Sequence, residues 1–184
     1  IIFGGVRRIS KFTQVVVPFM ALGYLVLALI VIAFNVSALP EVFTLIISSA
    51  FSIHAGFGAI VGSAIEMGVK RGIYSNEAGQ GTAPHAAAAA EVSHPVKQGL
   101  VQAFSVYIDT LIVCTATALM ILLTGFYNVG SADGAIIYTG LPGVEAGPGY
   151  VQNVFETIIP GFGAILLAIA LFFFAFTTIL AYYY

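Results

Sequence analysis

Residues 25–34 read LVLALIVIAF and residues 165–176 read ILLAIALFFFAF, so both stretches lack polar side chains on every face of a helix. Of the 184 residues, 60% are hydrophobic and only 8% are charged. In soluble domains about a quarter of the residues are charged. This composition, with a mean hydropathy of +1.04, excludes water as the main solvent of the chain and favours a lipid bilayer.

Four apolar stretches are long enough to cross a bilayer as helices. A hydrocarbon core of about 30 Å requires about 20 helical residues. The stretches cover approximately residues 12–34, 42–68, 99–125 and 158–181. Membrane-spanning strands would instead alternate apolar and polar side chains. The sequence therefore predicts an all-α integral membrane fold in which four transmembrane helices form one bundle.

The positions of the positive charges give these spans a direction. The six basic residues are Arg7, Arg8, Lys11, Lys70, Arg71 and Lys97. They fall before the first span or between the second and third spans, and basic segments of this kind remain in the cytoplasm. We therefore expect residues 1–11 and the loop 69–98 to be cytoplasmic. Residues 35–41 and the loop 126–157 then lie outside.

The outer loop 126–157 is rich in glycine and proline, for example in residues 140–143, which read GLPG. This composition favours turns over a continuous helix. Two interpretations of the loop stand, a lid over the bundle and a plain linker.

The second span carries three glycines near its middle, in residues 51–63, which read FSIHAGFGAIVGS. Small residues of this kind allow helices to pack closely. The alternative is an unwound segment whose freed backbone groups bind a zwitterion or a cation. His54 adds a polar side chain at this depth, which needs a partner. A hydrogen bond to a neighbouring helix would also satisfy it.

Asp109 lies about ten residues inside the third span, a depth of about 15 Å at 1.5 Å per residue. Because a carboxylate in contact with lipid is costly there, Asp109 must face protein or water. A structural hydrogen bond, acceptance of a proton and stabilisation of a nearby cation all fit this position.

Thr177 and Thr178 follow the aromatic run of the fourth span. Their hydroxyl oxygens are hard ligands of the kind that alkali cations prefer. Threonines in membrane helices, however, most often donate to carbonyl groups of their own helix. The residues alone favour this second, back-bonded arrangement.

The cytoplasmic loop contains the most distinctive polar segment, residues 70–85, which read KRGIYSNEAGQGTAPH. Ser75, Asn76 and Glu77 are able to cap backbone donors there. The alanine run 86–90 favours a short helix. A metal site formed by His85, Glu91 and His94 is not favoured, because their spacing matches no strong pattern.

Chemistry of other classes has little support in the sequence. No phosphate-binding loop, nucleophile beside a base or pair of carboxylates is present, so an enzyme is not expected. No basic aromatic patch favours nucleic acid. Cys114 is the single cysteine, which excludes a disulfide within the chain. The start at Ile1, without methionine, suggests a piece of a longer protein.

Several motifs together resemble the alanine or glycine:cation symporter family. The loop residues 71–81 read RGIYSNEAGQG, and residues 109–110 and 114–118 read DT and CTATA. Residues 17–21 read VPFMA near the start, and residues 174–180 read FAFTTIL near the end. The resemblance therefore extends over the whole chain.

This resemblance implies a leucine-transporter-type fold, in which two five-helix inverted repeats surround unwound first and sixth helices. The four spans would be helices five to eight of that bundle. It further implies uptake of alanine or glycine by alternating access, driven by sodium or protons, with sodium as the coupling ion and no cofactor. The implied location is the plasma membrane, in bacteria the inner membrane. The implied partners are the lipid bilayer and the remaining helices of the same transporter, and not nucleic acid.

The resemblance also implies site residues. The substrate-binding residues would be His54, Gly56, Phe57, Gly58 and Ile60, with Phe57 and Ile60 lining the side-chain pocket. Thr177 and Thr178 would donate hydroxyl oxygens to sodium, with the carbonyl of Phe174 as a weaker ligand. Asp109, Asn76 and Glu77 would be further functional residues.

One departure from the family pattern keeps an alternative open. The family carries Gln where His54 stands and Gly-Gly-Phe where residues 58–60 read GAI. A non-transporting membrane subunit, with a binding or structural role and the same bundle, is therefore the alternative to a symporter.

Overall fold

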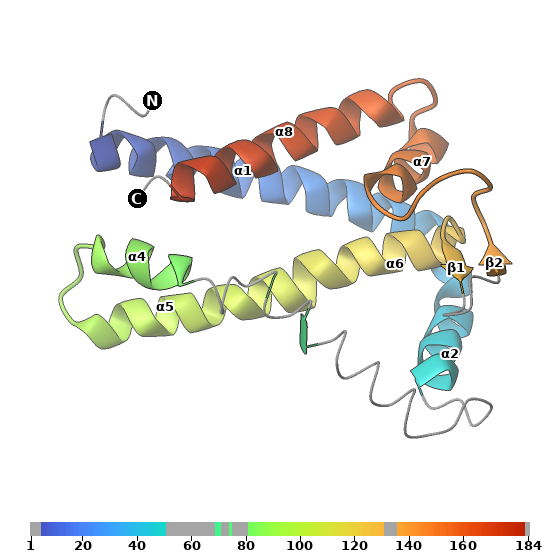
Figure 1. Ribbon diagram of the computed structural model, residues 1–184, viewed down its shortest axis with the longest axis horizontal. Helices are drawn as coiled ribbons and strands as arrows, with labels where there is room; N and C mark the ends of the chain where they lie inside the picture. Colours follow the sequence, from blue (N-terminus) through green and yellow to red (C-terminus); the bar gives the residue numbers. More distant parts are fainter. Residues whose placement is uncertain (1–4, 51–68, 71–73, 75–80, 131–135, 183–184) are drawn as a thin grey trace. The chain divides into compact units, whose positions relative to one another are not determined.

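The chain folds mostly into helices, shown in Figure 1 as a computed structural model. The structure describes residues 5–50, 69–70, 74, 81–130 and 136–182. The chain divides into two compact units, Ile1–Leu39 with Ala116–Ile179 and Pro40–Thr115 with Leu180–Tyr184.

Each unit has its own set of elements. The first contains α1 (Gly5–Phe34), the 3-10 helix η2 (Val36–Ala38), most of α6 (Thr115–Thr124), the strands β1 (Asn128–Gly130) and β2 (Ile136–Thr139), α7 (Pro148–Ile158) and most of α8 (Gly163–Tyr182). The second contains most of α2 (Leu39–Ala50), α4 (Thr82–Ala88), α5 (Pro95–Tyr107) and the π-helix η3 (Ile108–Cys114).

Two of the described helices are long and apolar enough to cross a membrane: Lys11–Phe34 within α1, and the continuous helix Pro95–Thr124 formed by α5, η3 and α6. Only 11% of the apolar window of each helix is buried. The core helix of a soluble protein would be mostly buried, whereas these helices direct apolar side chains outward. Such surfaces suit contact with lipid or with other apolar helices.

The expected spans 12–34 and 99–125 overlap these two long helices. The other two expected spans overlap shorter apolar helices, Val36–Ser49 and Gly163–Ile179. Most of the expected span 42–68 lies outside the described residues.

α5 begins at Pro95, before the expected start of its span at residue 99. The ring Nδ1 of the N-cap residue His94 accepts a hydrogen bond from the backbone N–H of Val96 at 3.2 Å. Pro95 occupies the first turn, where a missing N–H costs nothing. His94 therefore caps a helix. From the sequence alone, this histidine is considered only as a metal ligand.

A short helix is present at the alanine run 86–90 as α4, but it begins earlier, at Thr82, and ends within the run at Ala88. Within the second unit, α4 lies beside α5 (Figure 1). The side-chain Nε2 of Gln102 in α5 donates to the carbonyl of Ala83 in α4 at 3.4 Å.

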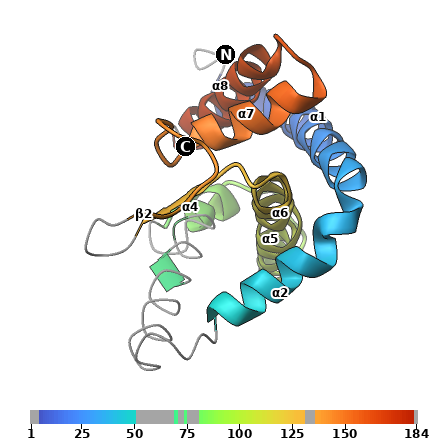
Figure 2. The ribbon, with the colours of Figure 1, turned by 90° about the vertical axis from the view of Figure 1, so that its right-hand side faces the viewer.

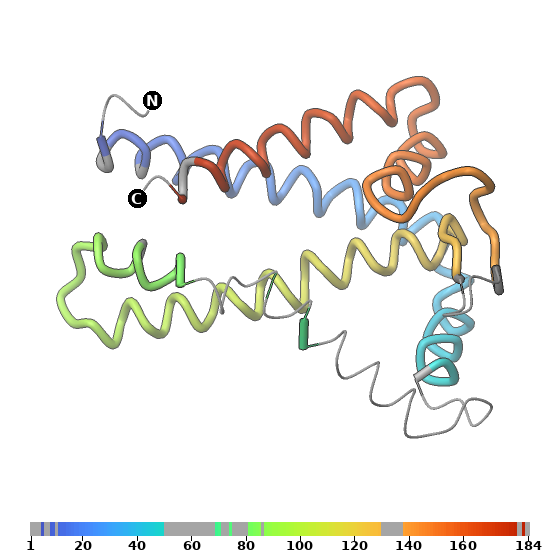
Figure 3. The backbone as a smooth tube through the Cα atoms, in the orientation of Figure 1, coloured from blue at the N-terminus to red at the C-terminus, as the bar shows by residue number. Residues whose placement is uncertain are grey.

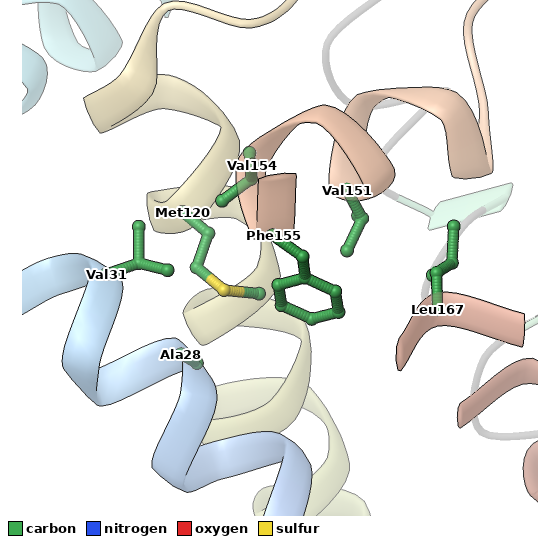
Figure 4. Close-up of a cluster of buried hydrophobic side chains, with 7 residues drawn as sticks. All are labelled: Ala28, Val31, Met120, Val151, Val154, Phe155 and Leu167. Carbon is green, nitrogen blue, oxygen red and sulfur yellow. The ribbon is translucent and has the colours of Figure 1, made fainter. Parts of the chain in front are cut away.

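The core of the first unit is formed by α1, α6, α7 and α8. Seven buried residues make up this cluster (Figure 4): Ala28, Val31, Met120, Val151, Val154, Phe155 and Leu167. Val151, Val154 and Phe155 are spaced three and four residues apart, so one stripe of α7 faces the core. Close packing of these side chains joins the four helices of the first unit.

The connection between α6 and α8 is more ordered than its glycine and proline content suggests. β1 and β2 pair as an antiparallel hairpin, so the all-α prediction is wrong for these two short strands. α7 follows the hairpin, so the connection contains a helix of 11 residues beside its turns and is not one continuous helix. Pro148 lies at the start of α7, where proline is compatible with a helix, and the apolar stripe of α7 then supplies the packing.

Asn128 joins the hairpin to the segments that follow it. Its Nδ2 donates to the carbonyls of Leu141 at 2.7 Å and Val144 at 2.9 Å. Its Oδ1 accepts from the backbone N–H of Leu141 at 2.9 Å. Its own backbone N–H donates to the hydroxyl of Tyr150 in α7 at 3.1 Å. One residue thus connects three segments that are far apart in sequence.

Glu156 fixes the turn between α7 and α8. Its Oε1 accepts from the backbone N–H of Gly161, and its Oε2 accepts from the N–H of Gly163 at 2.8 Å. The carboxylate therefore satisfies free donors at the positive end of α8. Gly161 has a φ of +83°, a conformation that favours glycine. Because of this turn α8 begins at Gly163 and not at residue 158, and Figure 2 shows α7 beside its first turns.

Candidate functional site

The hydroxyl groups of Thr177 and Thr178 lie on consecutive residues of α8. Thr177 Oγ1 donates to the carbonyls of Phe173 at 2.9 Å and Phe174 at 3.0 Å. Thr178 Oγ1 donates to the carbonyl of Phe174 at 2.9 Å. Thr177 is half-buried and Thr178 is exposed. Both threonines therefore donate to carbonyls of their own helix, as the sequence predicts.

Back-bonding leaves these two oxygens able to bind a cation. A hydroxyl group has one hydrogen and two lone pairs, and here each hydrogen is already used by a helix carbonyl. The oxygens of Thr177 and Thr178 can therefore act only as acceptors. The carbonyl of Phe174 differs, because it already accepts hydrogen bonds from both threonines. The two hydroxyl oxygens are consequently more available to an ion than this carbonyl.

Tyr24 of α1 contacts three other helices of the first unit. Its hydroxyl lies 2.7 Å from Oγ1 of Thr117 in α6. Its ring meets the ring of Phe155 in α7 edge-on at 6.3 Å, and the ring of Phe174 in α8 edge-on at 5.8 Å. Tyr24 therefore reaches the residue whose carbonyl accepts both threonine hydroxyls.

A second aromatic contact joins α1 and α8, which run side by side in opposite directions (Figure 3). Phe12 meets Phe176 edge-on at 5.9 Å, with an interplanar angle of 86°. The angle between Tyr24 and Phe174 is also 86°. The two contacts have nearly the same geometry, but only the second involves a residue that is hydrogen-bonded to the threonines.

Asp109 lies in the π-helix η3, which interrupts the α-helical pattern between α5 and α6. It is half-buried and lies about 21 Å along the helix from Pro95, because α5 begins earlier than expected. Thr115 Oγ1 donates to the carbonyl of Thr110 at 3.2 Å, five residues back, which matches the wide turn of a π-helix. π-helical segments are frequent at functional sites.

Sequence reasoning missed η3 and Tyr24. No residue in the segment 108–114 is a glycine or proline, so no signal marks η3. A signal exists for Tyr24, because it is the only polar side chain between residues 19 and 34. A buried phenol needs a hydrogen-bond partner, and this requirement predicts a contact with another helix.

A cavity of ≈ 390 Å³ lies in the first unit, near the C-terminal ends of α1 and α6. Its lining residues are Val31, Phe34, Asn35, Leu123, Thr124, Phe126, Thr157 and Ile158. The hydroxyls of Thr124 and Thr157 donate to carbonyls of their own helices. The lining includes no residue that the sequence predicted as part of a site.

The predicted substrate-binding residues His54, Gly56, Phe57, Gly58 and Ile60 lie outside the described residues. The same is true of Asn76 and Glu77 in the predicted cytoplasmic loop. Of the predicted site residues, the structure describes Asp109 in the second unit and Phe174, Thr177 and Thr178 in the first.

Relatives from several organisms match the whole chain. It is 67% identical to YrbD of Bacillus subtilis (strain 168) and 61% identical to the sodium/proton-dependent alanine carrier protein of Bacillus sp. (strain PS3). It is 40% identical to the sodium/alanine symporter AgcS of Methanococcus maripaludis. These matches cover 38%, 41% and 38% of the respective relatives, so the chain spans about two fifths of their length.

The family comparison covers the same region. The model of the sodium:alanine symporter family matches residues 1–184, which is the full length of the chain. This match agrees with the motifs in the predicted cytoplasmic loop and in the third and fourth expected spans. The chain belongs to the sodium:alanine symporter family.

Proposed function

We propose that this chain is part of a sodium-coupled symporter that carries alanine or glycine across the plasma membrane by alternating access. Support comes from the family of the chain and from relatives named as an alanine carrier and a sodium/alanine symporter. The relative from Bacillus sp. is named for both sodium and protons, so proton coupling is the variant to test beside sodium.

The proposal includes the arrangement of the whole transporter. The four predicted spans would be helices five to eight of a leucine-transporter-type bundle, with residues 1–11 and 69–98 in the cytoplasm. The remaining helices of the same protein would complete the bundle. The charge distribution and the apolar, mostly unburied surfaces of α1 and Pro95–Thr124 support this arrangement.

The observation that carries the proposal is the geometry of Thr177 and Thr178. Both hydroxyl hydrogens are directed to helix carbonyls, which leaves two adjacent oxygens as acceptors on α8. We propose that sodium binds these oxygens together with groups from the first helix of the bundle. The carbonyl of Phe174 remains the weaker candidate ligand.

Sodium binding and substrate binding would be coupled. A cation held between the eighth and first helices stabilises the unwound segments that bind the amino acid. Because such coupling is reciprocal, the amino acid must raise the affinity for sodium by the same factor. The backbone around Gly56 and Gly58 would bind the charged groups of alanine or glycine, and Phe57 and Ile60 would limit the size of the side chain.

Asp109 would contribute a charge near the middle of the membrane. A carboxylate about 15 Å inside a span that begins at residue 99 is costly in lipid and is usually retained for function. The π-helical turn at Asp109 supports a functional role over a purely structural one. A proton or a cation is the group that this side chain would serve.

Uptake by the full-length transporter that carries this chain tests the proposal. Reconstituted vesicles would receive labelled alanine with an inward sodium gradient, with choline in place of sodium, or with a pH gradient alone. We expect accumulation with sodium that collapses in choline. Uptake that is indifferent to both gradients, or alanine binding without flux, would favour the non-transporting subunit, which nothing in the names of the relatives supports.

A further inference from the structure

We infer that Tyr24 is a positioning residue of the proposed sodium site, acting on Thr177 and Thr178 through Phe174. The inference rests on the proposed function, because it concerns the site where sodium would bind. Tyr24 lies on α1 and would not contact the ion. Its role would be to hold α8 in the position where the hydroxyl oxygens of Thr177 and Thr178 are able to bind sodium.

The first step of the argument is the anchor of Tyr24. Its hydroxyl lies 2.7 Å from Oγ1 of Thr117, within a helix that is otherwise apolar from residue 19 to residue 34. A partly buried phenol needs a hydrogen-bond partner, and Thr117 of α6 supplies one. The hydrogen bond therefore fixes the direction of the ring and not only its depth.

The second step is the contact between Tyr24 and α8. The ring of Tyr24 packs edge-on against Phe174 at 5.8 Å and against the fully buried Phe155 at 6.3 Å. Phe155 belongs to the core cluster, so the ring of Tyr24 has a buried packing partner besides Phe174. Phe174 is therefore held by a ring that is itself hydrogen-bonded and packed.

The third step links Phe174 to the threonines. Its carbonyl accepts the hydroxyls of Thr177 at 3.0 Å and Thr178 at 2.9 Å, so Phe174 contacts both; Thr177 also donates to Phe173 at 2.9 Å. A rotation of α8 at Phe174 would turn both hydroxyl oxygens together. Removing the anchor of Tyr24 should therefore lower the fraction of molecules whose site is ready for sodium, which lowers the apparent affinity by the same fraction.

The test is the substitution Tyr24→Phe in the full-length transporter, which keeps the ring and removes the hydroxyl. A hydrogen bond of this kind has a net worth that corresponds to about a 2- to 10-fold change in an equilibrium. We expect the sodium concentration for half-maximal alanine uptake to rise by this factor. The alanine concentration for half-maximal uptake at saturating sodium, and the maximal rate per folded transporter, should change little.

The partner of Tyr24 supplies a second pair of variants. Thr117→Val should raise the sodium requirement as much as Tyr24→Phe, and the double variant should be no worse than either, because both remove the same bond. Thr117→Ser keeps the hydroxyl and should restore the sodium requirement of the unmodified protein.

Two matched controls separate a specific rise in the sodium requirement from a general loss of packing or stability. Tyr138→Phe removes a phenol hydroxyl that donates to the carbonyl of Gly125 at 3.2 Å in the hairpin, and it should leave the sodium requirement unchanged. Phe12→Leu disrupts the other edge-on contact between α1 and α8, at 5.9 Å, without touching the threonines. It should change the amount of folded protein more than the sodium requirement.

The outcomes distinguish the inference from the proposed function. If Thr177→Val raises the sodium requirement while Tyr24→Phe and Thr117→Val leave it unchanged, the inference is wrong and the sodium site stands. An equal rise in the two controls would also overturn the inference. If Thr177→Val has no effect, the sodium site itself is misplaced, whatever the variants of Tyr24 show.

Discussion

The connection between α6 and α8 and the long helices on either side of it are held by different kinds of interaction. In the connection, side chains bind backbone groups of other segments, as Asn128 does with Leu141 and Val144 and as Glu156 does with Gly163. In the helices, hydroxyls such as those of Thr13 and Thr178 donate to carbonyls of their own helix.

This difference has a mechanical consequence. Apolar faces and self-satisfied hydroxyls let helices such as α1 and α8 shift at little cost in hydrogen bonds, whereas the bond between Tyr24 and Thr117 joins α1 to α6. The connection instead carries directional bonds between segments, which a displacement would break. We therefore expect the hairpin and α7 to remain one rigid piece during transport, while α1 and α8 adjust around the contact at Tyr24.

The largest effect is expected for Gly140→Ala at the end of the hairpin. A Cβ atom at this position would lie 1.9 Å from the carbonyl oxygen of Gly125 and 2.8 Å from that of Tyr127, and both are backbone atoms. The hairpin would have to open, at a cost of about 3 kcal/mol. A thermal-stability assay in detergent should show a strongly lowered midpoint or no folded protein.

Gly143→Ala is the matched control for this prediction, because it lies in the same connection. Its φ is +76° but nothing lies within 4 Å of an added Cβ atom, so only the backbone strain of about 1–2 kcal/mol applies. Equal stability losses in the two variants would contradict the close approach at Gly140 and weaken the case for a rigid connection.

A smaller loss is expected for Asn128→Ala. It removes three side-chain hydrogen bonds, for an expected loss of about 2 kcal/mol. The carbonyl of Leu141 still accepts from the N–H of Val144 at 3.3 Å, whereas that of Val144 loses the Asn128 donor. The thermal midpoint should fall, whereas the sodium requirement of the remaining folded protein should not change. A shift in sodium requirement would show that the connection and the helices are not mechanically separate.

Asp109→Asn tests the role of the carboxylate that lies within an expected membrane span. The substitution keeps the size and one acceptor oxygen, replaces the other oxygen with an amide donor and removes the charge. We expect maximal uptake to fall about tenfold, which equals about 1.4 kcal/mol. Glu145→Gln is the control, since Glu145 is exposed in the connection. Unchanged uptake with Asp109→Asn would assign Asp109 a structural hydrogen bond only.

The smallest effect concerns pH. Burial raises the pKa of Tyr127 above its ordinary value of 10.0, and the nearby Tyr138 phenol adds to this rise. Below pH 10 the phenol is neutral in both states and the hairpin keeps its full stability. As the pH rises through the raised pKa, the unfolded chain ionises more readily and stability falls. The thermal midpoint should decline less steeply above pH 10 in Tyr127→Phe, and an identical decline would contradict this account.

The sequence predicted the helical class and the short helix at the alanine run because both follow from local composition. It also placed the threonines of α8 in a back-bonded geometry, which their own helix determines. It failed where contacts between distant segments decide the outcome. The hairpin depends on Asn128 meeting residues 141–144, and the start of α8 depends on Glu156 reaching Gly163.

The π-helix at Asp109 was not predictable for a different reason. Its bond pattern differs from that of an α-helix by one residue per turn, and the residues of the segment 108–114 are compatible with both. Tyr24 carried a readable signal, since its hydroxyl required a partner, but the sequence alone does not identify Thr117. The substrate-binding residues around Gly56 stay predictions.

The most direct test of the sodium site is the sodium dependence of alanine uptake in Thr177→Val, Thr178→Val and Thr124→Val. Thr124 has the same forked back-bonding as Thr177, to Met120 at 2.8 Å and Ile121 at 3.1 Å, but it lies in α6. We expect the α8 variants to need about tenfold more sodium for half-maximal uptake and Thr124→Val to need no more than the unmodified protein. A sodium requirement that is unchanged in the α8 variants, or raised equally in all three, would contradict the account.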